Sequence, residues 1–367
     1  MSVFRVPEKG VTLKSKLSIL GIETSCDETS AAVVSGSLEV LSNVIASQIP
    51  THQLYGGVVP EIASRQHLEQ VNFVVKQALD DAHHSLSDIS GIAVTCGPGL
   101  VGALLVGVSL AKGLAYGSGI PIVGVNHIEG HLYANLLSQD YKKSEEIWPS
   151  LALIVSGGHT ELILWHKNDK LERLGSTKDD AAGEALDKFA RVLGLSYPGG
   201  PAIEQAATNG NDHSMILPTI AFEGKLDFSF SGLKTAALNA VHKAKQQGKP
   251  LTVEDAAASY QRAVVDTLLV KTKQALIETG AKRLFLAGGV AANSLLRKQM
   301  QLLCQNEGVI LNVPERWLCT DNAAMIAAAG LTKLQLGYQA TLSLNAYPSL
   351  KLGQDIPDEV FLHSDIS

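Results

Sequence analysis

Residues 17–34, LSILGIETSCDETSAAVV, carry the pattern that decides the fold. Residues 17–23 form an apolar run typical of a β-strand, residues 24–27 are small and polar, and residues 29–34 form a second apolar run. Two such runs around a short polar turn predict a β-hairpin at the start of the fold.

The same order of elements recurs about 130 residues later in the chain. A second motif, a strand followed by a glycine turn and a helix, also occurs twice. Such self-similarity predicts two copies of one α/β unit, with ligands held in the cleft between them. The second hairpin consists of strands 151–155 and 160–165 around the turn 156–159. In the other repeat, strand 91–95 and helix 101–116 correspond to strand 283–287 and helix 292–303.

The composition predicts a soluble globular protein of enzyme size. The chain has 367 residues, of which 46% are hydrophobic and 33 are glycine, enough for two well-packed domains. Its four cysteines are scattered without a C-x-x-C pair, which favours a reducing cytoplasm over a disulfide framework or a zinc ribbon. The longest apolar stretches, such as residues 100–110, fall short of the roughly 20 residues of a membrane span, so we expect no transmembrane helix.

The charge of the chain limits how it can meet nucleic acid. The net charge is −6, and no long block of lysine and arginine is present. Counterion release therefore cannot supply strong binding by this chain alone. An RNA substrate would need a local basic patch or a partner protein.

The composition along the chain also suggests its domain limits. Residues 1–16 are basic but lack the apolar core of a secretory signal, so we expect a flexible lead-in. The polar stretch 138–149 contains a proline and predicts a surface linker. The expected domains are lobe I at 17–140, lobe II at 150–340 with a helical insertion at about 175–260, and a C-terminal segment at 341–367.

The motif His127-Ile-Glu-Gly-His131 predicts a metal site. Two imidazoles four residues apart stand on the same helix face and can reach one ion. An isolated pair of this kind is also common as buried structure or on a solvated helix face. The zinc-protease motif H-E-x-x-H is absent, because Glu129 stands two residues after His127 and points elsewhere around the helix.

A two-histidine site needs a further ligand, and Asp321 is the best oxygen donor. Asp321 precedes an alanine-rich helical run, so a local role as helix N-cap is equally compatible with the sequence. Asp27 and Glu28, in the turn of the first hairpin, are possible general bases, although turn acids are often merely exposed.

Several turns can hold a phosphorylated or nucleoside ligand. Ser156-Gly157-Gly158-His159 offers free backbone N–H groups for an anion. A helix over residues 178–193 with Asp179 and Asp180 at its start is expected, and Asp187 lies on it. Glu204 follows the turn around Gly200, and Asn293 follows Gly288-Gly289 at the start of a helix, both placements that suit a nucleotide.

Two nucleotide-binding signatures are missing. Gly97-Pro98-Gly99-Leu100-Val101-Gly102 matches G-x-G-x-x-G, but no acidic residue follows about 20 positions later to hold a ribose. No G-x-x-x-x-G-K-[ST] occurs, which excludes the P-loop enzymes. We expect a tight strand-to-helix turn at 97–102 instead.

Eight ordered motifs resemble the tRNA N6-adenosine threonylcarbamoyltransferase family in its bacterial form, once described as O-sialoglycoprotein endopeptidases. The resemblance runs from about residue 17 to residue 333. The motifs are GIETSCDET (21–29), HIEGH (127–131), VSGGHT (155–160), DDAAGE (179–184), YPGGP (197–201), DFSFSGLK (227–234), GGV (288–290) and TDNA (320–323).

This resemblance implies an α/β fold of the actin-like ATPase type, shared with sugar kinases and Hsp70 chaperones, with two related lobes and a central cleft. It implies transfer of a threonylcarbamoyl group from threonylcarbamoyl-AMP to N6 of adenosine 37 in tRNAs that read codons beginning with A. By the same resemblance one divalent ion, Fe²⁺ or Zn²⁺, would be held by His127, His131 and Asp321. The acyl-adenylate would be held by Ile154, Val155, Ser156, Gly157, Gly158, Asp187, Gly200, Glu204 and Asn293.

The resemblance also implies partners, namely an inactive paralogue and a small ATPase, and no membrane. Two other functions have to be weighed. An actin-fold kinase of small metabolites would share the glycine turns and the duplication, but it uses phosphate-borne magnesium and needs no imidazole ligands. A metalloendopeptidase would need the glutamate that H-E-x-x-H places beside the first histidine.

Overall fold

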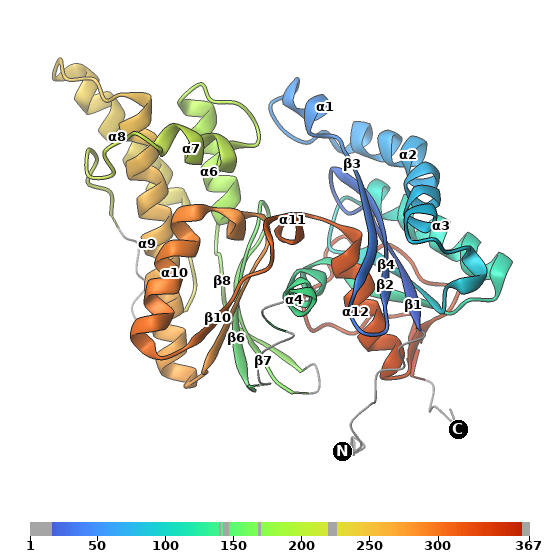
Figure 1. Ribbon diagram of the computed structural model, residues 1–367. Helices are drawn as coiled ribbons and strands as arrows, with labels where there is room; N and C mark the ends of the chain where they lie inside the picture. The colour runs from blue at the N-terminus through green and yellow to red at the C-terminus, as the bar shows by residue number, and fades with distance from the viewer. Residues whose placement is uncertain (1–16, 139–140, 142–146, 168–169, 219–225, 362–367) are drawn as a thin grey trace.

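Two β-sheets, one in each lobe, form the framework of this computed structural model (Figure 1). The structure describes residues 17–138, 141, 147–167, 170–218 and 226–361. The predicted lead-in at 1–16 and most of the predicted linker at 138–149 lie outside them. The domain limits given above therefore remain a prediction.

The first sheet has seven strands in the order β12-β11-β5-β4-β1-β2-β3. β1 is antiparallel to β2 and parallel to β4, which confirms the predicted first hairpin. The strands are β1 Ser18–Glu23, β2 Glu28–Ser35, β3 Val40–Ser47, β4 Gly91–Gly97, β5 Ile122–Asn126, β11 Tyr338–Ala340 and β12 Glu359–Phe361.

The second sheet has five strands in the order β10-β9-β6-β7-β8. β6 is antiparallel to β7 and parallel to β9, as β1 is to β2 and β4. Five strands of each sheet thus share one topology, which confirms the predicted duplication. The strands are β6 Ser150–Val155, β7 Thr160–Trp165, β8 Leu171–Ser176, β9 Arg283–Ala287 and β10 Ile310–Asn312.

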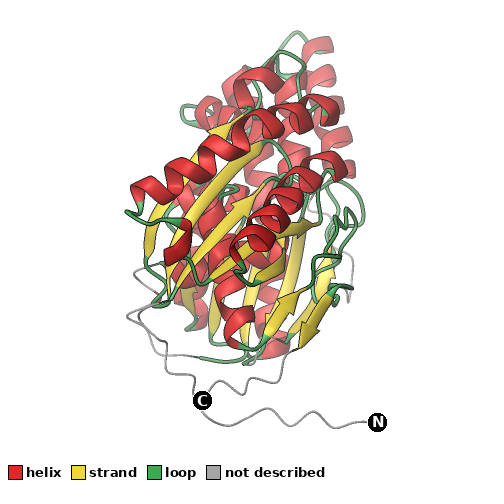
Figure 2. Ribbon diagram, turned by 90° about the vertical axis from the view of Figure 1, so that its right-hand side faces the viewer, coloured by secondary structure: helices red, strands yellow, loops and turns green. Residues whose placement is uncertain are grey.

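Helices cover both faces of each sheet. α2 and α3 pack on the outer face of the first sheet, and Figure 2 shows long helices lying across the strands. The helices are α1 Ile49–Gln53, α2 Pro60–Asp81, α3 Val101–Ser118, α4 His127–Leu137, α6 Ala182–Val192, α7 Gly199–Ala207, α8 Ser231–Gln246, α9 Val253–Thr279, α10 Ser294–Glu307, α11 Arg316–Cys319 and α12 Ala323–Gln335, with 3₁₀ turns η1 Leu86–Asp88 and η2 Gly289–Ala292.

The helices α4 and α12 lie between the two sheets and pack against each other (Figure 1). α12 contacts β1, β2 and β4 of the first sheet, although the sequence places it after the whole second sheet. α4 contacts β5 of the first sheet and also β6 and β9 of the second. One apolar core therefore joins the two lobes, and both helices belong to it.

Glycines allow α12 to approach the first sheet closely. A Cβ added at Gly21 on β1 would lie 2.3 Å from the carbonyl oxygen of Ala323, and one added at Gly330 on α12 would lie 2.2 Å from the Cβ of Ala93. Contacts this short require the backbones to move apart. The position of α12, and of the residue that precedes it, therefore depends on these two glycines.

One helix of the described residues, α3, is long and apolar enough to cross a membrane by length and composition. In the structure its buried side, including Ala103, Leu104 and Val108, packs on β4 and α2. α3 is thus accounted for as a helix of the first lobe.

The predicted helix over 178–193 is wrong at its start, because α6 begins at Ala182. The carboxylate of Asp179 instead accepts hydrogen bonds from the backbone N–H of Phe230 (2.8 Å) and of Ser231 (3.3 Å), at the start of α8. A carboxylate at a helix N-terminus satisfies otherwise unpaired N–H groups. Asp179 therefore fixes α8 and does not begin α6.

We expect Gly330→Ala to lower the free energy of unfolding by about 1–3 kcal/mol, because the added methyl group would overlap Ala93. Gly113 on α3 provides the matched control, since nothing lies within 4 Å of a Cβ added there. Gly113→Ala should stabilise by about 0.5–1 kcal/mol through helix propensity. Urea unfolding of both variants measures this, and equal effects of the same sign would contradict the packing argument.

Candidate metal centre

The helix α4 presents two histidines at its first turn. β5 ends at Asn126, whose side-chain oxygen caps α4 by accepting hydrogen bonds from the N–H of Ile128 (2.9 Å) and of Glu129 (3.4 Å). This cap starts the helix at His127, so His127 and His131 stand one turn apart on the same face. Their ring centroids lie 4.8 Å apart.

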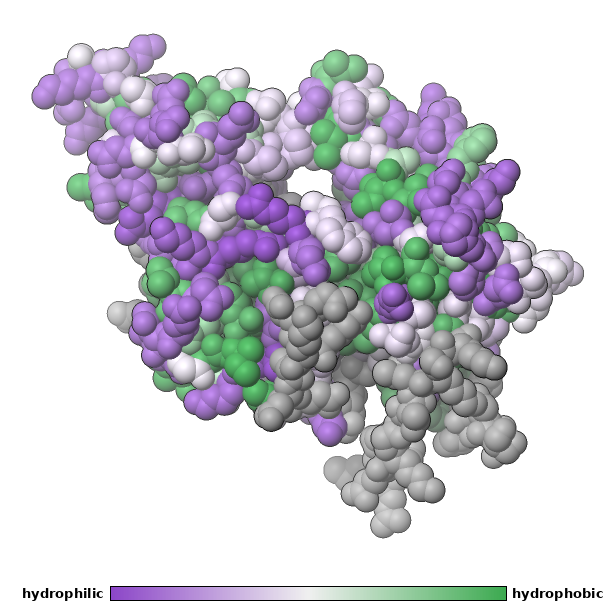
Figure 3. All heavy atoms as spheres, in the orientation of Figure 1, coloured by the Kyte–Doolittle hydropathy of each residue, from purple (hydrophilic) through white to green (hydrophobic). Residues whose placement is uncertain are grey.

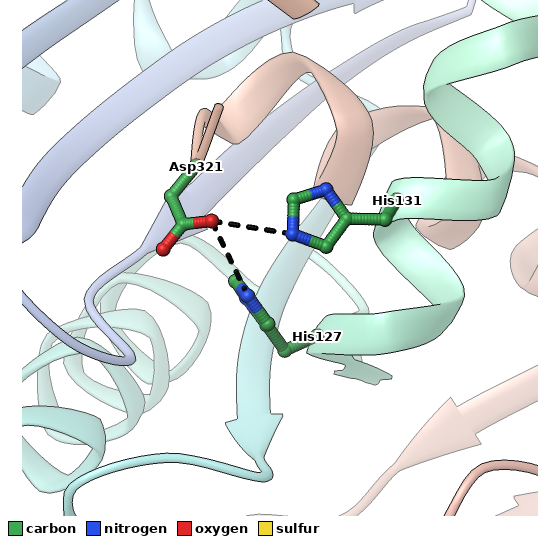
Figure 4. A group of neighbouring side chains, drawn as sticks. All are labelled: His127, His131 and Asp321. Carbon is green, nitrogen blue, oxygen red and sulfur yellow. Dashed lines mark ion pairs between the residues drawn. The ribbon is translucent and has the colours of Figure 1, made fainter. Parts of the chain in front are cut away.

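Asp321 reaches both histidines from the other end of the chain (Figure 4). Its Oδ1 lies 3.4 Å from Nε2 of His127 and 3.2 Å from Nε2 of His131. The N-cap of α12 is the neighbouring Asn322, whose side chain accepts from the N–H of Met325 at 3.1 Å. Asp321 is therefore not the helix cap, and its carboxylate is left to face the histidines.

The geometry of these three side chains fits a metal ion. Their ligand atoms all lie within 4.8 Å of one another. His131 is fully buried, yet neither of its ring nitrogens has a hydrogen-bond partner among the described residues. The Nε2 atom of His131 lies only 3.2 Å from the Asp321 carboxylate, so both groups are placed to ligate one ion. A divalent transition-metal ion suits two imidazoles and a carboxylate.

Without an ion, the charges of the cluster compensate one another. Burial opposes ionisation of the Asp321 carboxyl, but the adjacent His127 overcomes this and holds the pKa of Asp321 well below its ordinary value. Burial likewise opposes protonation of His127, but the carboxylates of Asp321 and Glu23 raise the pKa of His127 well above its ordinary value. The centre is thus built to balance a positive charge in a buried place.

Glu23 is a member of this site that the sequence reasoning missed. Its Oε2 accepts a hydrogen bond from Nδ1 of His127 at 3.0 Å and from Oγ1 of Thr95 at 2.5 Å. Its Oε1 accepts from the N–H of Ser25 at 2.5 Å. A carboxylate behind a metal-binding histidine fixes the tautomer and leaves Nε2 free to bind. The sequence offered one signal for this role, an acidic residue at the end of an apolar run.

Asp27 lies in the turn after β1, whereas Glu28, predicted to lie in the same turn, is the first residue of β2. Burial raises the pKa of Asp27, and the negative charge of Asp321 raises it further, which places Asp27 near the metal cluster. Burial raises the pKa of Glu28 to about 8, although a hydrogen bond of 2.8 Å from Ser47 acts in the opposite direction. The two acids therefore differ in their readiness to accept a proton.

The glycine turn of the second lobe lies beside the histidines. The N–H of Ser156 donates to the carbonyl of His159 at 2.8 Å, which closes the turn. Burial lowers the pKa of His159 to about 4, with further contributions from His127 and His131. Gly157 and Gly158 are exposed, and a Cβ added to either would meet nothing within 4 Å. Their backbone is therefore open to a ligand next to the metal cluster.

The remaining predicted ligand residues fall into two groups. Ile154 and Val155 are buried strand residues whose side chains belong to the cores, so only their backbone can face a ligand. Asp187 accepts a hydrogen bond from the N–H of Gly199 at 2.6 Å, which ties α6 to the start of α7 beside Gly200.

Glu204 and Asn293 form the second group. Oε1 of Glu204 accepts a hydrogen bond from the N–H of Ser294 at 2.9 Å. Oε2 of Glu204 lies 3.4 Å from Nδ2 of Asn293. Asn293 also caps α10 and donates to Gln261 at 3.0 Å. The structure thus brings Glu204 and Asn293 together from α7 and α10.

A short bridge joins the two lobes over the cleft, and Figure 3 shows an opening between them. Nε2 of Gln53 donates to the carbonyl of Tyr197 at 2.6 Å, and the Arg191 guanidinium donates to the carbonyl of Gly56. Burial raises the pKa of Tyr197, and the charges of Asp27 and Asp187 add to this. Tyr197 therefore lies between carboxylates of both lobes.

We expect Glu23→Gln to weaken divalent-metal binding about 10- to 100-fold, because the amide would lose part of the hydrogen-bond set that orients His127. Titration calorimetry with Zn²⁺ measures the affinity, and thermal unfolding shows that the variant is folded. The matched control is Glu172→Gln, since Glu172 on β8 is 54% exposed. Wild-type affinity in a folded Glu23→Gln protein would contradict this role.

Solved structures with low sequence identity show the fold alone. The HypF protein of T. kodakarensis matches with a TM-score of 0.59 at 14% identity, over 88% of this chain and 48% of that one. Component A of the (R)-2-hydroxyglutaryl-CoA dehydratase of Acidaminococcus fermentans matches with a TM-score of 0.52 at 15% identity, over 86% and 98%. The fold is the actin-like ATPase fold that the sequence predicted.

Sequence comparisons identify the family. A model of tRNA N6-adenosine threonylcarbamoyltransferases matches residues 39–328. Proteins of that name from Desulfitobacterium hafniense and Bacillus subtilis are 55% identical over 337 residues and 51% identical over 335 residues, respectively. These alignments cover 92% and 91% of this chain, and 98% and 95% of the relatives. The chain that builds this histidine and aspartate cluster belongs to the tRNA N6-adenosine threonylcarbamoyltransferase family.

Proposed function

We propose that this protein transfers the threonylcarbamoyl group of threonylcarbamoyl-AMP to N6 of adenosine 37 in tRNAs that read codons beginning with A, releasing AMP in the cytoplasm. The observation that carries this proposal is the cluster of His127, His131 and Asp321, close enough to the open glycine turn to lower the pKa of its His159. Together they offer a cation and backbone N–H groups to one acyl-phosphate substrate. The family match supplies the chemical identity of that substrate.

His127, His131 and Asp321 would hold one Fe²⁺ or Zn²⁺ ion. The exocyclic amine of adenine is a poor nucleophile, and such an ion would act as a Lewis acid and a template on the acyl-phosphate group. Glu23 keeps His127 in the tautomer that a ligand needs. Residues of both lobes would therefore contact one substrate.

The second lobe would hold the adenylate. The N–H groups of Gly157 and Gly158 would bind the negative oxygens of the acyl-phosphate and of the transition state. Asp187, Gly200, Glu204 and Asn293 would surround the nucleoside, with Ile154, Val155 and Ser156 contributing backbone groups. Support for this role is the convergence of α6, α7 and α10 described above.

Asp27 is the better of the two candidate proton acceptors. At neutral pH Glu28 remains largely protonated, because burial raises its pKa to about 8. The pKa of Asp27 is also raised, by burial and by Asp321, which makes its carboxylate a stronger base than an exposed one. In this proposal Asp27 accepts the proton that leaves N6 as the new carbon–nitrogen bond forms.

We expect Asp27→Asn to lower kcat for transfer about 10²- to 10⁴-fold, the usual contribution of a positioned general base, while metal content stays at the wild-type level. The assay contains tRNA, threonine, bicarbonate, ATP, the adenylate-forming enzyme and the partner proteins, and scores the modified nucleoside. Glu28→Gln serves as the matched control and should lose less activity. A full rate in Asp27→Asn with bound metal would remove Asp27 from the mechanism.

The two other functions find less support. A small-metabolite kinase needs no imidazole ligands, whereas His127 and His131 converge here on Asp321. A metalloendopeptidase needs the glutamate that follows the first histidine of its motif, but here Glu129 lies on another side of α4. Its carboxylate is near Lys333 and raises the pKa of that amine, whereas burial lowers it. The family match favours neither function.

Partner proteins, an inactive paralogue and a small ATPase, form the second half of the proposal. A groove of about 490 Å³ runs between α2 and α3, lined by Leu68, Val71, Leu105 and Leu110 among others. Leu68 is 67% exposed and Leu105 41% exposed. Exposed apolar side chains on adjacent helices are typical of a protein interface. A paralogue would present a similar pair of helices, so we place it on this face.

We expect Leu68→Asp to reduce transfer in the complete mixture, because it would put a charge into the apolar interface with the paralogue. Metal content and thermal stability should not change, since Leu68 is exposed. Analytical ultracentrifugation with the paralogue measures the loss of the complex. The control is Glu69→Lys on the same helix. Full activity without any partner, or an intact complex with Leu68→Asp, would contradict this placement.

A further inference from the structure

The turn that follows β1 is held at three successive carbonyl groups by three different elements. The carbonyl of Ser25 accepts from the N–H of Leu100 at 2.8 Å, before α3. The carbonyl of Asp27 accepts from the N–H of Gln48 at 3.0 Å, before α1. The carbonyl of Cys26 accepts from Nε2 of His67 on α2 at 2.9 Å. Only the last of these donors is a side chain, so it can be removed by substitution without a change to the backbone.

His67 is held in one protonation state by its surroundings. It is fully buried, and Oγ1 of Thr29 lies 2.7 Å from its Nδ1. A carbonyl oxygen can only accept, so Nε2 carries the proton. In a neutral ring Nδ1 is then the acceptor, and Thr29 donates to it. Burial lowers the pKa of His67, which agrees with a neutral ring.

Two titratable neighbours act on His67 in opposite directions: the Glu23 carboxylate favours protonation of its ring, and His52 disfavours it. The backbone of Cys26 and the hydroxyl of Thr29 occupy its two nitrogens. His52, the other nearby histidine, bonds Gln48 at 3.1 Å and the N–H of Val59 at 3.3 Å. Both ring nitrogens of His67 are therefore engaged, one by the turn and the other by Thr29 of β2.

We propose that His67 is a positioning residue of the transfer reaction, which fixes the Cys26–Asp27 turn to α2 and so sets where the Asp27 carboxylate stands in the cleft. The proposal rests on the function proposed above, since it assigns His67 to the reaction of the same site. His67 itself need not touch substrate. Its inner position on α2, next to Leu68 on the outer side, also makes the turn and the partner-facing helix one connected unit.

The test compares two substitutions of similar size. Gln can place an amide N–H where Nε2 stands, whereas Asn is too short to reach the Cys26 carbonyl. We expect His67→Asn to lower kcat about 10- to 100-fold through misplacement of the reacting groups, with KM and metal content unchanged. His67→Gln should restore most of the rate. In an Asp27→Asn background, His67→Asn should cause little further loss, because both act through the same carboxylate.

Amide hydrogen exchange gives a readout that does not depend on activity. His67→Asn should speed exchange in peptides that cover residues 24–28, and His67→Gln should not. Unchanged exchange in His67→Asn, or losses that add fully to those of Asp27→Asn, would overturn the proposal. If the wild-type protein failed to modify tRNA, the proposed function would fail, while the exchange experiment would still decide whether His67 holds the turn.

A second pair of variants covers the case in which His67→Asn does not fold. Thr29→Val removes the hydroxyl that fixes the ring, and Thr29→Ser keeps it. The same contrast is expected, with faster exchange and a lower kcat in Thr29→Val only. Equal behaviour of these two variants would also overturn the proposal.

Discussion

The whole site depends on the packing of α4 and α12 against each other between the two sheets. α4 follows the fifth strand of the first sheet, whereas α12 comes after the entire second sheet. Their contact brings Asp321 to histidines nearly 200 residues earlier in the chain. The close approach of α12 to β1 and β4 at Gly21 and Gly330 makes this contact possible. The cluster therefore depends on the contact between two helices that are far apart in the sequence.

A buried group of charges is expensive unless each is paired. Here the carboxylates of Glu23 and Asp321 face His127 from its two sides, at 3.0 Å from Nδ1 and 3.4 Å from Nε2. Glu23 is itself held by Thr95 and by the backbone of Ser25. Through Ser25 this network continues into the turn that carries Asp27. The turn that carries the proposed proton acceptor is therefore anchored, through Ser25, to the network that orients His127.

Much of the fold could be predicted from local sequence, because the hairpins and the strand, turn and helix units rest on short-range patterns. Both hairpins and the duplication are confirmed. The packing of α12 on the first sheet could not be predicted, since nothing near residue 323 indicates which sheet it meets. The predicted start of α6 was wrong for a similar reason. Asp179 accepts hydrogen bonds from the start of α8, about 50 residues later, and so does not belong to α6.

The site shows the same division. The spacing of His127 and His131 predicted one shared helix face, and the structure places them on it. The sequence left open whether Asp321 is a metal ligand or the N-cap of α12. In the structure Asn322 is the N-cap, so the carboxylate of Asp321 is left to face the histidines. The sequence did not indicate the roles of Glu23 and His67, because these arise from distant contacts. Glu23 contacts His127, which lies 104 positions later, and His67 contacts Cys26, which lies 41 positions earlier.

His127, His131 and Asp321 would bind one metal ion together, although Asp321 lies nearly 200 residues after the histidines. Anomalous X-ray diffraction from crystals grown with Fe²⁺ or Zn²⁺ tests it most directly. We predict a single peak, at about 2.0–2.2 Å from Nε2 of both histidines and from a carboxylate oxygen of Asp321. An absent peak, or an ion bound elsewhere with these three side chains uncoordinated, would contradict the account.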